Sequence, residues 1–488
     1  MVINFNKKRR KIALVILIIL CAIGVFFLIN HKTENDTMQI VDDKQINNYI
    51  IDVVFNDKDK IIECNQNITY VNNTGKTLDK LYMHIYPNAF SDSETCPFEK
   101  EEMEQAYPNG FNRGYIDILN ILNSNKKLKY NITGDKKDIL EIQLDKELKK
   151  GEKCSIDMKY NVKLPNCLGR FGYGDDTINI TNWFPIACVY DEKGWNLGSY
   201  SAIGDPFYSD TSNFTVNILV PNKYEIASTG SIIEEKKDKD KKLCKLQAKK
   251  VRDFAMILSD KFIINKSVYG KTSIITYSLD KDLAVEANKI AKESIKVFSE
   301  LFTEYPYDTY SVVASDFFIG GMEYPTLVMI DKNLYDEDSK FLLEYVIAHE
   351  TAHQWWYSIV GNDEVSEPWL DEALTEYSTI LYFESRYGKD VSDKLMKTMK
   401  VQSENYRGED MFKAINEFGS SSEYSLNVYT KGAVVFNEIR KEVGDKIFFE
   451  TLKEYCNNYM FQNVNGNQFM KMWKDKGVDI NKIVDKCN

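Results

Sequence analysis

The metal-binding pattern at residues 349–353, HETAH, constrains the fold more than any other feature of the sequence. Residues four apart lie on one face of an α-helix, so His349 and His353 can face one metal ion if this segment is helical. Glu372 lies in the next segment of helical periodicity, which has Pro368 near its start and Gly388 just past its end. Two consecutive helices must therefore face each other across one metal site.

The chemistry of these side chains indicates zinc. Two neutral imidazoles and one carboxylate form a His₂Glu set, which leaves a fourth position open for water or substrate. Glu350 lies beside the ligands and can accept a proton from the activated water. The chain has only 4 His, so a chance occurrence of this pattern is improbable. The sequence predicts one Zn²⁺ per chain, held by His349, His353 and Glu372.

Two acidic residues near Glu372 are candidates for supporting the ligands. Metal-bound histidine usually donates its second ring N–H to a carboxylate or a carbonyl. Asp371 and Glu376 are both close enough in sequence to Glu372 for this role. The alternative, a solvated acidic helix face, stays open at this point.

The length and net charge of the chain limit its domain organisation and its partners. A chain of 488 residues exceeds one ordinary core and predicts two or three domains. The net charge of −11 argues against nucleic acid as a partner, because phosphate binding needs a basic face. The oligomeric state cannot be derived from the sequence.

The N-terminus shows a targeting pattern. Residues 1–11 end in a basic cluster and predict a cytoplasmic tail, the uncharged apolar run 12–29 predicts a transmembrane anchor, and residues 30–40 predict a spacer. The expectation is a single-pass membrane protein with an extracellular catalytic part. A cleaved signal peptide and lipidation at Cys21 are alternatives. Outside the cell, the eight remaining cysteines could form disulfides, whose pairing the sequence does not reveal.

The remaining chain divides by periodicity. Residues 41–262 show the alternation of strands, as in the segment 212–220, and the charge run 234–242 is typical of a solvated hairpin tip. Residues 263–488 mix strand-like segments with several helical ones. The sequence thus predicts a β-rich N-terminal domain followed by an α+β catalytic domain.

The segments HETAHQWW and WLDEALTEY resemble the gluzincin zinc aminopeptidases, the family that includes aminopeptidase N and the leukotriene epoxide hydrolase. GGMEYP (320–325) and YTKG (429–432) resemble further family segments. DPFYSD (205–210), ASTG (227–230) and RDFAMILSDKF (252–262) resemble the end of its N-terminal sheet domain. The likeness runs from about residue 40 to the C-terminus, with its motifs in the family's order.

The resemblance implies a β-sandwich or saddle-like sheet domain, a thermolysin-like catalytic domain and peptide substrates. It implies that Gly320, Gly321, Met322 and Glu323 bind substrate on an edge strand, with Glu323 holding the substrate's free α-ammonium. Tyr429 matches the tyrosine that hydrogen-bonds the developing oxyanion, and Tyr424 is a weaker candidate for assisting it.

The sequence also departs from the family. Few residues follow the catalytic segment, so no large helical domain is expected after it. Many relatives have a glutamine that also contacts the substrate amine, and residues 179–192 contain none. Amine recognition then depends mainly on Glu323. A zinc endopeptidase, a hydrolase of another bond and an inactive binding protein are the alternatives to an aminopeptidase.

Overall fold

The computed structural model describes residues 45–281, 283–404 and 410–487, which belong to one compact unit, Val41–Asn488. The predicted transmembrane anchor at 12–29 lies outside the described residues. Within the described ranges, no helix has the length and apolar character needed to cross a membrane. The sequence had predicted a single-pass membrane protein with an extracellular catalytic part and a membrane-bound N-terminal helix. This finding contradicts that localisation, which is withdrawn.

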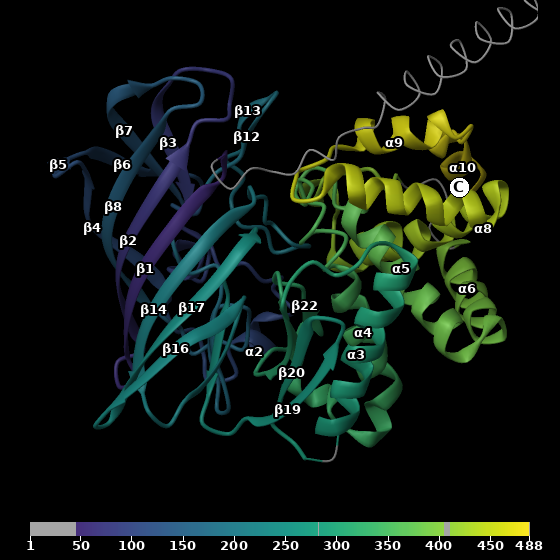
Figure 1. The fold of residues 1–488 in the computed structure, drawn as a ribbon, viewed down its shortest axis with the longest axis horizontal. Coiled ribbons are helices and arrows are strands. Elements are labelled where there is room, and N and C mark those ends of the chain that lie inside the picture. Colours follow the sequence, from purple (N-terminus) through teal and green to yellow (C-terminus); the bar gives the residue numbers. More distant parts are fainter. Residues whose placement is uncertain (1–44, 282, 405–409, 488) are drawn as a thin grey trace, which may run out of the picture. The chain divides into compact units, whose positions relative to one another are not determined.

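The N-terminal part is built of strands (Figure 1). Its main sheet has eight strands, and alternating burial along β14 shows one face in the core and one facing outward. β1 pairs in parallel with β14 and antiparallel with β2. The strand order is β16 (Ser231–Asp238), β17 (Lys241–Val251), β14 (Ser212–Pro221), β1 (Asn47–Asn56), β2 (Ile61–Val71), β8 (Lys153–Lys163), β4 (Tyr115–Asn123), β5 (Lys126–Lys127).

Three smaller sheets complete the N-terminal part. The charge run 234–242 lies at the β16–β17 hairpin, where most of its side chains are exposed. The orders are β15 (Glu225–Ser228), β18 (Met256–Ser259), β10 (Ile178–Ile180), β9 (Gly172–Tyr173); then β11 (Ile186–Ala187), β3 (Leu78–His84), β7 (Ile139–Leu148), β6 (Lys129–Thr133); and the pair β12 (Tyr190–Asp191), β13 (Gly194–Trp195). Short helical segments are η2 (Tyr86–Phe90) and α2 (Met103–Ala106).

A five-stranded sheet begins the C-terminal part. Its order is β19 (Ile263–Tyr269), β20 (Thr272–Ser278), β21 (Thr309–Ser315), β23 (Leu327–Asp331), β22 (Gly321–Met322). The three central strands are parallel, and β21 and β23 are buried along nearly their whole length, as expected of parallel strands covered on both faces. The short strand β22 forms one edge and pairs antiparallel with β23.

Helices make up the rest of the C-terminal part, where α3 and α4 pack on this sheet and α4 contacts α5. The longer helices are α3 (Ala284–Leu301), α4 (Lys340–Ala352), α5 (Trp369–Tyr387), α6 (Lys389–Ser403), α8 (Gly432–Tyr459), α9 (Gly466–Asp475) and α10 (Ile480–Cys487). The shorter ones are η3 (Lys332–Leu334), η4 (Glu337–Ser339), η6 (Ile415–Glu417), α7 (Ser421–Tyr424) and the π-helix η7 (Ser425–Lys431). The expected order, a β-rich part followed by a sheet-and-helix part, is confirmed at this level, while the boundary at 262/263 stays a prediction.

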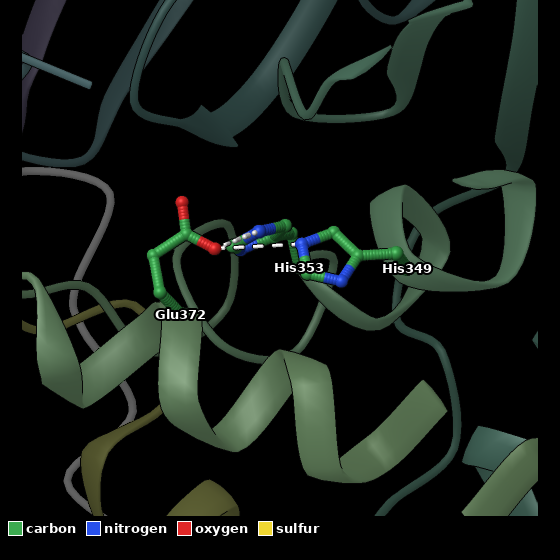
Figure 2. Close-up of side chains that lie close together, drawn as sticks. All are labelled: His349, His353 and Glu372. Atoms are coloured by element: carbon green, nitrogen blue, oxygen red, sulfur yellow. Dashed lines mark ion pairs between the residues drawn. The ribbon is translucent and has the colours of Figure 1, made fainter. Parts of the chain in front are cut away.

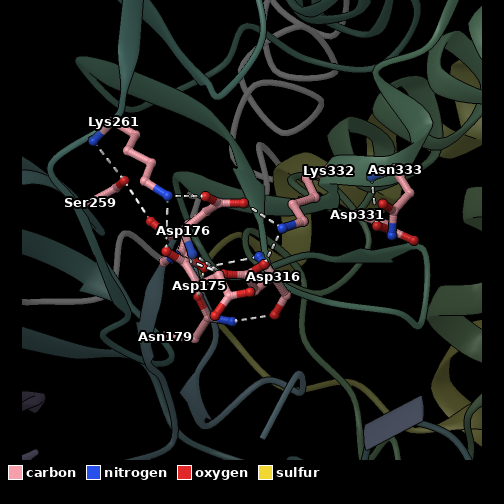
Figure 3. Close-up of polar contacts among 10 residues, drawn as sticks. Asp175, Asp176, Asn179, Ser259, Lys261, Asp316, Asp331, Lys332 and Asn333 are labelled. Carbon is pink, nitrogen blue, oxygen red and sulfur yellow. Dashed lines mark hydrogen bonds and ion pairs between the residues drawn. The ribbon is translucent and has the colours of Figure 1, made fainter. Parts of the chain in front are cut away.

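A polar network connects the strand-rich part to the loop that precedes β22 (Figure 3). Asp316 Oδ2 accepts hydrogen bonds from the backbone N–H groups of Asp176 (2.6 Å) and Thr177 (2.8 Å). Lys332 forms ion pairs with both Asp316 (2.5 Å) and Asp176. Because Asp316 is 2% exposed, these partners satisfy a buried carboxylate and fix the start of the loop that leads to Gly320.

The eight described cysteines are free thiols, six of them buried, so none of the disulfides that the sequence permitted is formed among the residues that the structure describes.

Candidate active site

Three buried side chains converge on one point between α4 and α5 (Figure 2). Glu372 Oε2 lies 3.1 Å from His353 Nε2 and 3.4 Å from His349 Nε2. That oxygen makes no hydrogen bond to any described group, although the residue is 2% exposed. Two imidazole nitrogens and one open carboxylate oxygen within 4.8 Å of one another fit a divalent metal, and the His₂Glu set is one that zinc prefers.

The helices explain why these three residues meet. The α4 helix has His349 in its last turn and His353 at its C-cap, so both imidazoles leave the same face. The α5 helix begins after Pro368, which pre-sets helical backbone angles, and ends at Gly388, whose φ of 87° suits glycine. Residues 369–383 of α5 are all buried, which holds Glu372 against α4.

Each imidazole is oriented by its second nitrogen. His349 Nδ1 lies 2.9 Å from Glu376 Oε2, and the Tyr345 hydroxyl donates to the other oxygen of Glu376 at 2.5 Å. His353 Nδ1 lies 3.0 Å from the Trp356 carbonyl oxygen and 3.1 Å from Thr375 Oγ1. Glu376 is thus the carboxylate that contacts a ligand histidine.

Asp371, the other candidate for that role, contacts neither histidine through a hydrogen bond. Its Oδ1 accepts from Asn362 Nδ2 at 2.8 Å, and its Oδ2 has no partner among the described residues.

The electrostatics of the cluster favour a cation. Burial alone would raise the pKa of Glu372, but His353 and His349 outweigh it and hold the pKa below its usual range. Burial would lower the pKa of His349, whereas the nearby carboxylates of Glu372 and Glu376 raise it to about 10. The same carboxylates would stabilise a divalent cation held by the neutral imidazoles.

Glu350 has the position and the environment of a general base. It is 6% exposed, and its Oε2 has no hydrogen-bond partner among the described residues. Burial, the largest effect, and nearby Glu372 and Asp205 raise its pKa to about 7 despite the two histidines. A pKa near the working pH suits a group that must both accept and return a proton.

The Gly-Gly-Met-Glu segment faces this base from the sheet edge. A Cβ atom on Gly321 would lie 2.1 Å from Glu350 Oε1, so any side chain at this position must displace Glu350. Gly320 has a φ of +104°, which side chains rarely adopt. Met322 is fully buried, and Glu323 is 3% exposed with Oε1 unpartnered among the described residues. The residues expected to bind substrate therefore lie at the edge strand β22 and directly after it.

Tyr429 reaches the same site from the π-helix η7. Its hydroxyl donates to Glu372 Oε1 at 2.5 Å, and its ring stacks on His349 at a centroid distance of 5.6 Å. The Tyr424 ring lies 5.6 Å from that of Tyr429, and its buried hydroxyl has no partner in the described part of the chain.

Two further charged residues at the site were not predicted from the sequence. Arg170 and Asp205 form a buried ion pair, and Arg170 Nε also donates to Met322 Sδ at 3.0 Å. A single Arg or Asp far from the zinc pattern carries no sequence signal of this kind.

Comparison with known proteins shows which family the C-terminal part resembles. Residues 286–487 match the Peptidase family M1 domain. Aminopeptidase B of Rattus norvegicus is 29% identical over 216 residues, which cover 40% of this chain and 32% of that protein. Aminopeptidase 2 of Candida albicans is 24% identical over 298 residues, covering 56% of this chain and 32% of that protein. The chain thus spans about a third of the length of these curated relatives.

Among solved structures, an M1 zinc metallopeptidase from Deinococcus radiodurans superposes with a TM-score of 0.65 at 15% identity. The match covers 90% of this chain and 93% of that one. A mutant of a two-domain M1 zinc metallopeptidase bound to L-arginine gives a TM-score of 0.66, also at 15% identity. At this identity the similarity shows a shared fold over nearly the whole chain.

Proposed function

We propose that this chain is a zinc-dependent aminopeptidase. Its residues 286–487 match the Peptidase family M1 domain, which supports the resemblance to the gluzincin aminopeptidases. The observation that carries the proposal is the convergence of His349, His353 and Glu372, with Glu350 and Glu323 open beside them. The relatives are named as aminopeptidases, and the substrates of this chain are proposed to be peptides with a free N-terminus.

Zinc, held by His349, His353 and Glu372, would supply Lewis acidity that polarises the scissile carbonyl and activates water. Glu350 accepts the proton of the attacking water, because its Oε2 has no partner in the described part of the chain and its pKa of about 7 allows it to be ionised at neutral pH. The same carboxyl then returns the proton to the leaving amine. Glu376 holds the His349 ring in the orientation that this requires.

Tyr429 is proposed to stabilise the oxyanion that develops on the scissile carbonyl. Its hydroxyl donates to Glu372 Oε1, which holds the ring at the ligand cluster. To serve an oxyanion, the hydroxyl would turn its one proton from Glu372 to the substrate oxygen. Tyr424 contacts the Tyr429 ring and is assigned a supporting position.

Glu323 is proposed to bind the α-ammonium of the substrate. Its buried Oε1 has no partner among the described residues, and one of its carboxylate oxygens lies within 4.8 Å of a ring nitrogen of His353. The two asparagines of the stretch that lacks glutamine have other partners: the Asn179 side chain donates to the carbonyl oxygens of Gly169 and Asp316, and Asn182 donates to Asp253.

The test is cleavage of a peptide library by the full-length chain, read by mass spectrometry, with every peptide in free and N-acetylated form. The expected result is that only free peptides shorten, one residue at a time from the N-terminus. Internal cleavage of acetylated peptides would instead show an endopeptidase and would remove the assigned role of Glu323. Bound zinc without turnover of any peptide would favour an inactive binding protein.

A further inference from the structure

The residue before Glu323 is held by the strand-rich part of the chain. Met322 is fully buried, and its Sδ accepts a hydrogen bond from Arg170 Nε at 3.0 Å. The same guanidinium forms an ion pair with Asp205 through Nη2, and its Cζ lies 5.7 Å from the centroid of the Phe207 ring. Because these contacts fix the guanidinium, it can hold the Met322 side chain in one place.

The residue after Glu323 is held by the same stretch of chain. The Tyr324 hydroxyl lies 2.7 Å from both Thr181 Oγ1 and Asn182 Oδ1. Thr181 donates its own proton to the carbonyl oxygen of Arg170 at 2.7 Å, so its oxygen can accept from Tyr324. Thr181 therefore connects the two anchors.

The main chain around Glu323 has few ladder contacts of its own. The edge strand β22 has two residues, Gly321 and Met322, which pair with β23. Gly320 precedes them, and glycine leaves the backbone more freedom than any other residue. Glu323 follows the strand directly, and its buried Oε1 has no hydrogen-bond partner among the described residues. The place of its carboxylate therefore depends on the side-chain contacts of its two neighbours.

We propose that Arg170 is a positioning residue for the substrate-binding segment. Through its hydrogen bond to Met322 it sets where Glu323 lies, and it thereby acts on catalysis without binding the substrate itself. The inference rests on the proposed aminopeptidase function. It goes beyond that function because it gives a residue of the strand-rich part, far from the zinc pattern in sequence, a role in the geometry of the active site.

The test is a double-mutant cycle of Arg170→Lys and Met322→Leu. Lysine keeps a cation opposite Asp205 but lacks the fork that contacts two partners at once, and leucine keeps the volume of methionine without the sulfur acceptor. Each single variant should lower kcat/KM on a peptide with a free N-terminus by about tenfold, and the double variant should lower it no further. Zinc content and unfolding temperature should stay near those of the wild type.

A second substrate separates positioning from a general structural effect. The desamino analogue of the peptide, in which hydrogen replaces the ammonium, does not use Glu323, so its kcat/KM should be the same in all four proteins. Two matched controls should leave both substrates unaffected: Arg113→Lys, at an exposed position, and Met158→Leu, at a buried position on β8.

Three results would overturn the role of Arg170. They are wild-type kcat/KM in both single variants, losses that multiply in the double variant, and an equal loss on both substrates with a lower unfolding temperature. The wild type tests the proposed function separately: equal cleavage of the free and desamino peptides would contradict an aminopeptidase, and with it the inference that rests on it.

Discussion

At the scale of single residues, the orientation of His349 depends on one carboxylate. Glu376 accepts from Nδ1 at 2.9 Å and is itself fixed by the Tyr345 hydroxyl. Partners of this kind typically contribute about 10- to 100-fold in metal affinity. We expect Glu376→Gln to weaken zinc binding by about that factor and Tyr345→Phe by less, measured by competition with a chromogenic chelator. Unchanged affinity in Glu376→Gln would contradict the assigned role.

At Gly321, the addition of a single methyl group should strongly reduce catalysis. A Cβ there would lie 2.1 Å from Glu350 Oε1, so Gly321→Ala must displace the proposed base. A displacement of about 1 Å is enough to reduce kcat on the order of 10²-fold. Zinc content should be unchanged. Gly198→Ala is the matched control, because its Cβ would meet only Val365 at 3.8 Å. A variant at 321 with wild-type kcat would show that Glu350 is not the base.

Asp253 makes folding stability depend on pH. Its burial raises the pKa to about 7, whereas an unfolded aspartate titrates near 4. Between these values the folded state binds the additional proton, so stability should fall as the pH rises from about 4 to about 7, by up to about 1.4 kcal/mol per pH unit. Asp253→Asn removes this slope. The measurement is the free energy of unfolding in urea at several pH values. The stability of the variant relative to wild type should rise with pH. Parallel curves of stability against pH for the two proteins would contradict the role of Asp253.

At the scale of elements, Arg252 connects the strand-rich part to the segment after α8. Its guanidinium donates to the carbonyl oxygens of Ser209 (3.0 Å) and Gln462 (2.7 Å), and a Cβ on Gly361 would collide with it. We expect Arg252→Met to destabilise the chain by about 3 kcal/mol or more, since buried partners lose their donor. Lys249→Met, at an exposed position on β17, should change the unfolding free energy little. Equal denaturation midpoints for Arg252→Met and the wild type would contradict the stabilising role of Arg252.

The elements also show how far the sequence determines the site. The spacing of His349 and His353, with Pro368 and Gly388 around the next helix, predicted that two helices hold the ligands, and α4 and α5 have that arrangement. Local spacing could not show whether Asp371 or Glu376 contacts a ligand histidine, because that depends on which side of α5 faces α4.

Contacts between distant segments could not be predicted at all. Arg170 and Asp205 lie in segments without periodicity, and they are recognised only once the fold pairs them and brings Arg170 into contact with Met322. Only the family resemblance indicated Tyr429, since local periodicity does not predict the π-helix that presents it.

At the scale of the whole molecule, metal binding and folding should be coupled. The ligands come from two helices, and Tyr429 adds a third element through its bond to Glu372. A ligand that binds only the folded state stabilises it by about 2.7 kcal/mol when its free concentration is 100 times its Kd. Zinc removal by a chelator should therefore abolish peptide cleavage and lower the unfolding temperature, and added Zn²⁺ should restore both. Glu372→Gln, which lacks one ligand, should show a much smaller shift. If the unfolding temperature and activity of the wild type were unaffected by chelation and metal analysis confirmed removal, the zinc site would have no role in either.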